Sequence, residues 1–201
     1  YTVLAGTQGY QNHRKKDRLF DVIERQRLPV VFFAEGGGGR PGDTDAPGVS
    51  GLDTVAFHLW GRMSGLVPRV GIAAGRCFAG NAAILGSSDV VIATRDANIG
   101  MGGPAMIEGG GLGVYAPEDI GPIEVQSANG VVDVVVEDEA EAVAVARRYL
   151  SYFAGPEPQP GWSCADQAVL RDLVPEDRRR AYDVRAVVEA LADTGSVLEL
   201  R

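Results

Sequence analysis

Two glycine-rich segments offer the clearest chemistry in this sequence, because each follows a short apolar run. The first is Glu35-Gly36-Gly37-Gly38-Gly39-Arg40, and the second is Gly75-Arg76-Cys77-Phe78-Ala79-Gly80-Asn81-Ala82. Glycines let successive backbone N–H groups turn toward one point, where they bind an anion or stabilise an oxyanion. The alternative for the first segment is a flexible surface loop. The alternative for the second is close packing of a helix on a sheet. Two such segments in succession favour a shared crevice lined by backbone donors.

No side chain near these segments is a convincing nucleophile. Cys77 has no evident base beside it and is predicted to be a small buried residue. His13 and His58 fall in predicted helices well before Cys77. Because His58 lies beside Phe57 and Trp60, we expect it to be a packed residue rather than a catalyst. The Cys and His spacing fits no zinc site, so we expect no metal. These observations favour stabilisation by backbone dipoles, with the reactive group brought by a cofactor or by the substrate.

The composition is that of a folded domain, with 201 residues, 45% of them hydrophobic, and a formal net charge of −8. It contains 27 glycines, which is roughly twice the usual share. An acidic chain argues against nucleic-acid binding, and no apolar run approaches the roughly 20 residues of a membrane-spanning helix. Residues 1–6 lack a signal-peptide pattern. The two cysteines, Cys77 and Cys164, indicate a reducing, cytoplasmic setting.

Alternating strands and helices must position the two glycine segments. The apolar run 30–34 predicts a strand buried on both faces directly before the first segment, and 70–74 predicts one directly before the second. Further strands are predicted over residues 89–94 and 131–136. Helices are predicted over residues 12–26, 52–64, 78–85, 137–153 and 184–191. The alternation indicates an α/β fold with a mostly parallel sheet.

Three further segments complete the chain. Residues 1–4 read as the tail of a strand, and residues 155–161, with three prolines, read as a stiff linker. A third glycine-rich segment spans residues 100–113, and the sequence assigns it no chemistry.

The order of these landmarks resembles a known family, the carboxyltransferase component of biotin-dependent acyl-CoA carboxylases. The first glycine segment is similar to the family's Asp-Ser-Gly-Gly-Ala-Arg loop, and the second to its Gly-x-Cys-x-Gly-Gly-Ala turn. Leu4-Ala5-Gly6-Thr7, with the charged helix after it, resembles a Gly-Gly-Ser strand end and a Lys-containing helix. Later matches are Ile99 to Pro104, Asn129 to Asp133, Leu173-Val174-Pro175, Ala181-Tyr182-Asp183-Val184 and Leu198-Glu199-Leu200. The resemblance covers essentially the whole chain.

This resemblance implies a crotonase-like (ClpP/crotonase) ββα superhelix and transfer of CO2 from carboxybiotin to the α-carbon of an acyl-CoA. It implies that the backbone N–H groups of Ala79 and Gly80 hold the thioester oxygen as an enolate. The candidate substrate-binding residues are Gly37, Gly38, Gly39, Arg40, Asn81 and Gly103. The implied cofactor is biotin on a carrier domain. The implied partners are the acyl-CoA, the biotin carboxyl carrier domain, the biotin carboxylase and further copies of the chain, with no nucleic acid and no membrane.

The chain departs from the family pattern at three positions of the candidate site and in its length. Ala79 replaces the first glycine of the family's pair, Gly36 replaces a serine, and Asn81 adds a polar amide that either contacts substrate or packs locally. Residues 1–201 match only the later part of the first of two carboxyltransferase domains. We therefore expect a fragment, an incomplete chain or one subunit of a split enzyme, with the second domain elsewhere.

Two alternatives use the same residues differently. A crotonase-type enoyl-CoA hydratase or isomerase would need a carboxylate base, for which Glu108 and Glu124 are the candidates, neither with a supporting motif. A non-catalytic scaffold subunit of a carboxylase complex would keep the fold for assembly alone.

Overall fold

A computed structural model of the chain describes residues 2–40, 55–155 and 163–200. The chain divides into two compact units, residues 1–153 with the last two residues, and residues 154–199. The larger unit contains both glycine segments. No helix among the described ranges is long and apolar enough to cross a membrane.

A four-stranded parallel sheet forms the centre of the larger unit. Its strands are β1 (Val30–Phe33), β2 (Arg69–Ala73), β4 (Val90–Thr94) and β6 (Val134–Val136), in the order β1-β2-β4-β6. Every neighbouring pair is parallel, so the predicted α/β fold with a parallel sheet is confirmed. The parallel order also brings the carboxyl ends of β1 and β2 to the same edge, directly before the two glycine segments.

A second, two-stranded parallel sheet is formed by β3 (Arg76–Phe78) and β5 (Asn98–Gly100). Each of these short strands follows a strand of the main sheet and precedes a helix, α3 (Gly80–Gly86) or α4 (Pro104–Gly109). This strand–strand–helix repeat is the unit of the predicted ββα superhelix. The sequence pattern predicted a turn at Gly75 followed by a helix from residue 78. In the structure, β3 follows this turn and the helix begins at Gly80.

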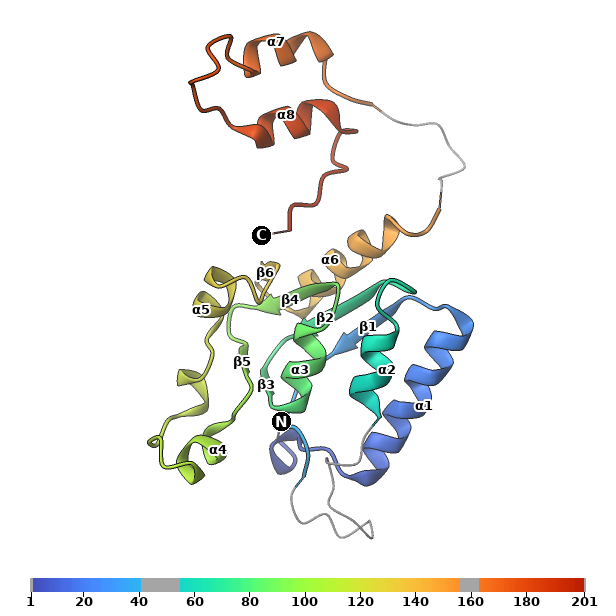
Figure 1. Ribbon diagram of the computed structural model, residues 1–201, viewed down its shortest axis with the longest axis vertical. Helices are drawn as coiled ribbons and strands as arrows, with labels where there is room; N and C mark the ends of the chain where they lie inside the picture. Colours follow the sequence, from blue (N-terminus) through green and yellow to red (C-terminus); the bar gives the residue numbers. More distant parts are fainter. Residues whose placement is uncertain (1, 41–54, 156–162, 201) are drawn as a thin grey trace. The chain divides into compact units, whose positions relative to one another are not determined.

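Helices cover both faces of the main sheet (Figure 1). On one face, α1 (Tyr10–Gln26), α2 (Ala56–Arg62) and α3 pack through a cluster that includes Phe20, Trp60 and Ile84. On the other face, α6 (Glu139–Ser151) buries Ala142 and Ala146 against Ile72 and Ile92. The predicted face of α6, with apolar residues three and four apart, therefore packs on the sheet as expected.

Strand β1 is less buried than its continuous apolar run predicts. Val31 and Phe33 are exposed, whereas Val30 is buried and Phe32 is half-buried. β1 is an edge strand, and α6 packs mainly on β4 and β6. The expectation of two buried faces was therefore wrong for this strand.

The beginning of the chain also differs from its prediction. Residues Leu4–Gly6 form a short 3-10 helix rather than the tail of a strand, and Leu4 and Ala5 both have positive φ. The predicted start of the second helix at residue 52 and the proline linker at residues 156–161 lie outside the described residues.

The segment between β5 and β6 holds α4, a 3-10 turn at Pro117–Asp119 and α5 (Ile123–Ala128). It exposes several large apolar side chains, namely Met101, Met106, Leu112, Val114 and Tyr115.

The smaller unit contains a 3-10 turn at Gln167–Val169, α7 (Leu170–Leu173) and α8 (Val184–Leu191). The Gln167 Nε2 donates to the Ala190 carbonyl oxygen at 2.6 Å, which joins the turn to α8. Asp183 caps the start of α8 by accepting from the Arg185 backbone N–H at 3.0 Å. The helix predicted over residues 184–191 is confirmed.

Candidate functional site

The two glycine segments lie directly against each other at the edge of the main sheet. The N–H of Gly36 donates to the Arg76 carbonyl oxygen at 2.7 Å, and the N–H of Phe78 donates to the Gly36 carbonyl oxygen at 2.9 Å. This bridge joins the loop after β1 to β3, which leads into α3. The expectation that both segments line one edge is therefore confirmed.

Only part of the first segment has free backbone donors. The N–H of Gly36 is used in the bridge to β3, and the N–H of Gly37 donates to the Ala5 carbonyl oxygen at 2.8 Å. Among the described residues, the N–H groups of Gly38 and Gly39 have no acceptor. The four glycines therefore do not form one nest; two of them fasten the loop and two can donate to a ligand.

In the second segment, the structure corrects the role expected for Ala79. Its N–H donates to the Gly100 carbonyl oxygen at 3.0 Å, as part of the pairing between β3 and β5. The N–H of Gly80, the first residue of α3, has no acceptor within the part of the chain that the structure describes. Such an N–H at the start of a helix is a natural donor to an anion.

Ala79 also holds a backbone conformation that glycine usually occupies. Its φ is 55° and its ψ is −126°, and for a residue with a Cβ such a conformation costs about 1–3 kcal/mol. This conformation of Ala79 turns the chain sharply from β3 into α3. The Gly80 N–H lies directly after the turn, at the first residue of α3.

The free donors of the two segments are neighbours. A Cβ placed on Gly38 would lie 3.4 Å from the Gly80 nitrogen and 2.7 Å from the Ala79 Cβ. Gly38 has a φ of +86°, so both its conformation and its surroundings require glycine. The N–H groups of Gly38 and Gly80 are therefore the candidate pair of oxyanion donors, which we call the donor pair.

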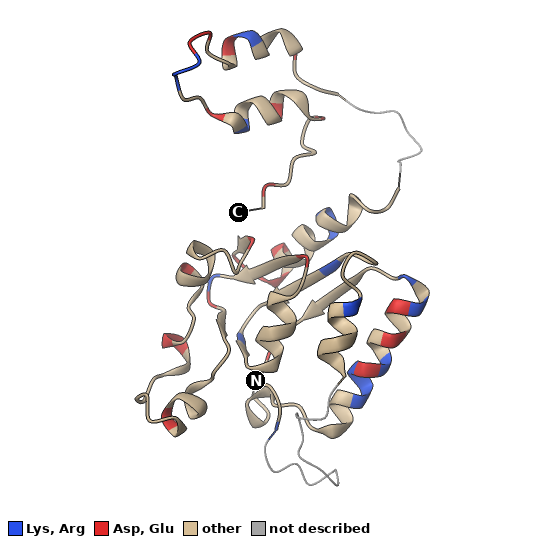
Figure 2. Cartoon of the chain, viewed as in Figure 1, with Lys and Arg blue, Asp and Glu red and all other residues tan. Residues whose placement is uncertain are grey.

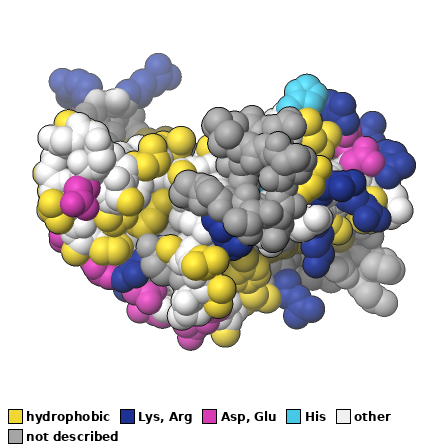
Figure 3. Space-filling view, turned by 90° about the horizontal axis from the view of Figure 1, so that it is seen from below, with side chains coloured by type: hydrophobic (Ala, Val, Ile, Leu, Met, Phe, Trp, Pro, Cys, Tyr) yellow, Lys and Arg dark blue, Asp and Glu magenta, His cyan; other side chains and the backbone are white. Residues whose placement is uncertain are grey.

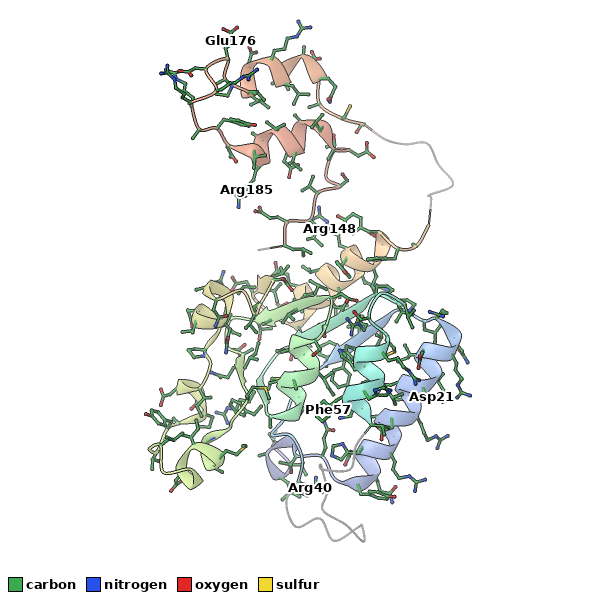
Figure 4. All side chains as sticks on the ribbon, viewed as in Figure 1. Asp21, Arg40, Phe57, Arg148, Glu176 and Arg185 are labelled. Carbon is green, nitrogen blue, oxygen red and sulfur yellow. The ribbon has the colours of Figure 1, made fainter. Side chains whose placement is uncertain are left out.

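An aromatic ring borders the donor pair. A Cβ on Gly80 would lie 2.9 Å from the Cζ of Phe57, which comes from α2 and is 44% exposed. Figure 4 shows Phe57 beside the start of α3. A group that accepts a hydrogen bond from Gly80 would thus lie next to an apolar wall.

Asn81 is committed to the protein rather than available to a substrate. Its side chain is 1% exposed, its Nδ2 donates to the Glu35 carbonyl oxygen at 2.7 Å, and its Oδ1 accepts from Gln8 Nε2 at 2.6 Å. The expectation that Asn81 binds substrate was therefore wrong, because both ends of its amide are used inside the fold.

Arg40 fastens the glycine loop to the beginning of the chain. Its Nη2 donates to the Thr7 carbonyl oxygen at 2.8 Å and its Nε to the Thr7 Oγ1 at 3.2 Å. Its backbone N–H donates to the Gln8 carbonyl oxygen at 2.8 Å. Arg40, labelled in Figure 4, therefore holds the glycine loop to the beginning of the chain.

Gly103 contacts the end of β3 rather than the donor pair itself. It precedes α4, and a Cβ on it would lie 3.6 Å from the Phe78 ring. Phe78 is buried and ends β3. The contact places Gly103 behind β3 and gives it a supporting position.

The remaining candidates bring no reactive side chain to this edge. Cys77 is fully buried, and burial, with a smaller contribution from Glu35, raises the pKa of its thiol to about 12. The prediction that Cys77 is a small buried residue is confirmed. His13 is buried in α1 as a packed residue, but His58 is exposed on α2, so the packing predicted for His58 was wrong.

The carboxylates of the hydratase alternative are also exposed. Glu108 lies on α4 and Glu124 on α5, both open to solvent. Among the described residues, no group of three or more His, Cys, Asp or Glu side chains is placed to hold a metal ion. What the described part of this edge offers to a ligand is the set of backbone N–H groups of Gly38, Gly39 and Gly80.

Figure 3 shows the face of the larger unit that carries this edge. Hydrophobic side chains gather on the side of α4, and Lys and Arg side chains gather on the side of α1. Figure 2 shows that α1 also carries acidic side chains between the basic ones.

Comparison with known proteins gives a consistent match over the whole chain. A family model described as the carboxyl transferase domain matches residues 1–201. The methylmalonyl-CoA carboxyltransferase 12S subunit of Propionibacterium freudenreichii subsp. shermanii is 27% identical and aligns with 100% of this chain and 39% of its own length. The biotin-dependent acetyl-/propionyl-coenzyme A carboxylase beta6 subunit of Mycobacterium tuberculosis is 29% identical, over 96% of this chain and 41% of its own length.

Solved structures agree with these matches. A single-chain, multi-domain long-chain acyl-CoA carboxylase is 62% identical over 100% of this chain and 20% of its own, with a TM-score of 0.90. The transcarboxylase 12S structure, with methylmalonyl-coenzyme A and methylmalonic acid bound, is 26% identical over 93% of this chain and 37% of its own, with a TM-score of 0.71. The present chain thus spans well under half of each of these relatives.

Proposed function

The chain belongs to the carboxyl transferase domain family, and from that membership we propose that it is part of the carboxyltransferase of a biotin-dependent acyl-CoA carboxylase. The reaction moves CO2 from carboxybiotin to the α-carbon of an acyl-CoA. The observation that carries the proposal is the donor pair at the junction of the two glycine segments, in a chain that the family model matches over residues 1–201. We further propose that residues 1–201 correspond to the later part of the first of two carboxyltransferase domains.

The donor pair stabilises the thioester oxygen as negative charge develops on it. Loss of the α-proton turns the thioester into an enolate, whose oxygen carries the charge. The N–H groups of Gly38 and Gly80 donate to that oxygen, and the dipole of α3 adds to the stabilisation. Because both donors belong to a fastened backbone, little reorganisation is needed when the charge appears. The enolate carbon then attacks CO2 to form the new carbon–carbon bond.

The group that removes the α-proton is better supplied by the cofactor than by a side chain of the described residues. A carboxylated biotin bound here would supply both the CO2 and the base for the α-proton. Cys77 stays protonated because of its raised pKa, and Glu108 and Glu124 are exposed. The described residues therefore orient and stabilise the substrate, with Arg40 holding the loop and Phe57 giving the pocket an apolar wall.

We propose a long-chain acyl-CoA as the substrate. The support is the 62% identity to a long-chain acyl-CoA carboxylase, against 26–29% for the relatives whose names carry methylmalonyl, acetyl or propionyl groups. The exposed Phe57 ring beside Gly80 suits an apolar acyl chain.

The partners follow from the same proposal. They are a biotin carboxyl carrier domain, a biotin carboxylase and further copies of the chain; the transcarboxylase 12S structure is described as a hexamer assembly. Both Cys77 and Cys164 are free, which fits the reducing cytoplasm in which we place the reaction.

The test is carboxylation by the complete enzyme that contains this chain. With ATP, bicarbonate and biotinylated carrier, palmitoyl-CoA should be carboxylated faster than acetyl-CoA. Gly80→Ala, whose added Cβ meets Phe57, should lower kcat, whereas Gly109→Ala on α4, whose Cβ meets nothing within 4 Å, should leave it unchanged. Hydration of an enoyl-CoA without ATP and biotin, or unchanged carboxylation by Gly80→Ala, would contradict the proposal.

A further inference from the structure

A chain of side-chain hydrogen bonds joins α1 to the first turn of α3. Lys16 Nζ donates to Gln8 Oε1 at 2.7 Å, Gln8 Nε2 donates to Asn81 Oδ1 at 2.6 Å, and Asn81 Nδ2 donates to the Glu35 carbonyl oxygen at 2.7 Å. We propose that Gln8 and Asn81 are positioning residues that hold Gly80 beside the glycine loop, and that Lys16 supports them by holding the side-chain oxygen of Gln8. The inference rests on the proposed function, because it concerns the geometry of the donor pair.

Gln8 contacts both the glycine loop, which carries the Gly38 donor, and α3, which carries the Gly80 donor. Its backbone N–H donates to the Gly38 carbonyl oxygen at 2.7 Å, and its carbonyl oxygen accepts from the Arg40 N–H at 2.8 Å. Its side chain reaches Asn81, which directly follows Gly80 in α3. Gln8 therefore links the segment that carries the Gly38 donor to the helix that carries the Gly80 donor, in addition to the Gly36 bridge to β3.

The direction of the chain of bonds follows from the chemistry of its first member. A lysine ammonium only donates hydrogen bonds, so the oxygen of Gln8 must face Lys16. The NH2 group of Gln8 then faces Asn81, and the Asn81 oxygen must accept from it. Only the Asn81 NH2 group remains to face Glu35, where a carbonyl oxygen accepts it. The Glu35 carbonyl oxygen, which only accepts, requires the same order from the other end, so Lys16 and Glu35 together fix the direction of both amides.

This arrangement has a cost in stability, which argues that it does more than fill space. Lys16 is partly buried, and desolvation lowers its pKa, an effect that the nearby Asp17 opposes. Asn81 is almost fully buried.

A buried asparagine outside the site supplies the matched control. Asn98, on β5, is also buried, and its Nδ2 donates to the Glu118 carbonyl oxygen at 3.0 Å. Like Asn81, it ties a loop to a regular element through its amide. Its partner lies in the segment after α4 rather than in the glycine loop.

The experiment compares Asn81→Ala, Gln8→Leu and their double variant with Asn98→Ala in the complete enzyme, measuring kcat, KM for palmitoyl-CoA and Tm. The enolate oxygen carries more charge than the ground-state carbonyl, so misplaced donors harm the transition state most. We expect Asn81→Ala to lower kcat about tenfold with KM changed less than about threefold. Asn98→Ala should lower Tm and keep kcat. Because Gln8 and Asn81 act through one bond, the double variant should lose little more than either single variant.

Lys16 gives a second readout that does not depend on the folding of the asparagine variants. Lys16→Arg keeps a group that only donates and should retain most of the wild-type kcat, whereas Lys16→Met should lower it. Equal kcat values for Asn81→Ala and Asn98→Ala, or independent losses that multiply in the double variant, would overturn the inference. A wild-type enzyme that carboxylates no acyl-CoA would instead overturn the proposed function.

Discussion

Two glycine-rich regions of the larger unit look alike in sequence and differ in structure. At the donor edge, formed by Gly36–Gly39 with Ala79 and Gly80, an added Cβ meets backbone or packed side chains at most glycines. In the Gly100–Gly113 segment the glycines divide: a Cβ would meet a neighbour at 2.9 Å on Gly100, 3.2 Å on Gly110 and 3.0 Å on Gly113, but nothing within 4 Å on Gly109 or Gly111. Glycine is required at the donor edge because strands and loops approach closely there. Glycine content alone therefore says little about function, and the neighbours of each glycine decide it.

The largest effect should come from Gly36, which joins the glycine loop to β3. Its φ is +107°, and a Cβ there would overlap the carbonyl oxygen of Gly6. Gly36→Ala should lower the free energy of unfolding by about 3 kcal/mol, since both the conformation and the contact become unfavourable. Denaturant unfolding of the complete enzyme measures this, and a loss below about 1 kcal/mol would remove the distinction between the two regions.

The second effect is a difference in thiol reactivity between the donor edge and the smaller unit. Burial raises the pKa of Cys77 from 9.0 to about 12, whereas Cys164 is half-buried. Near about pH 8, iodoacetamide should label Cys164 at least about a hundredfold faster than Cys77. Mass spectrometry of the labelled peptides measures both rates.

The raised pKa also predicts how stability depends on pH. Because the folded thiol has the higher pKa, its contribution is fully present below about pH 9 and is lost as the pH rises toward about 12. Cys77→Ser should weaken this dependence at alkaline pH. Rapid labelling of native Cys77 would contradict the buried position of β3.

The third effect concerns the strain at Ala79. Ala79→Gly relieves the φ of 55° and should raise the free energy of unfolding by about 1 kcal/mol, since relief of strain outweighs the entropy that glycine adds to the unfolded chain. Its N–H should still pair with Gly100, so kcat should stay near the wild-type value. A destabilised Ala79→Gly variant would show that the methyl group contributes more by packing than it costs by strain.

The smallest effect should come from Gly109, at the end of α4. Gly109→Ala adds a methyl group in open space and should change the free energy of unfolding by less than about 0.5 kcal/mol. A loss of several kcal/mol at Gly109 would mean that the Gly100–Gly113 segment is as constrained as the donor edge.

Local patterns predicted the parallel sheet and the meeting of the two glycine segments. The apolar runs before each segment identified β1 and β2, and parallel order brings their carboxyl ends together. Those runs did not reveal β3, because three residues after a turn carry too little periodicity. The pairing of β3 with β5 in turn engages the N–H of Ala79, which the resemblance to the carboxyltransferase family had assigned to the thioester oxygen.

The role of Asn81 was beyond the reach of local reasoning. Its partners are Gln8, 73 positions earlier, and Glu35, 46 positions earlier. Nothing in the sequence around Asn81 distinguishes an amide that faces a substrate from one that faces the protein. The exposure of Val31 and Phe33 was missed for a similar reason, because the extent of α6 over the sheet depends on packing.

The central claim, that the backbone N–H groups of Gly38 and Gly80 hold the thioester oxygen, is tested most directly by infrared spectroscopy. The complete enzyme is given palmitoyl-CoA labelled with 13C at the thioester carbonyl, without biotin, so that the substrate binds and does not react. Two hydrogen bonds should shift the carbonyl stretch of the bound substrate to lower frequency than that of free palmitoyl-CoA, equally in wild type and Gly109→Ala. Gly38→Ala should lose most of the shift. A bound wild-type complex whose carbonyl absorbs at the frequency of free palmitoyl-CoA would contradict the account.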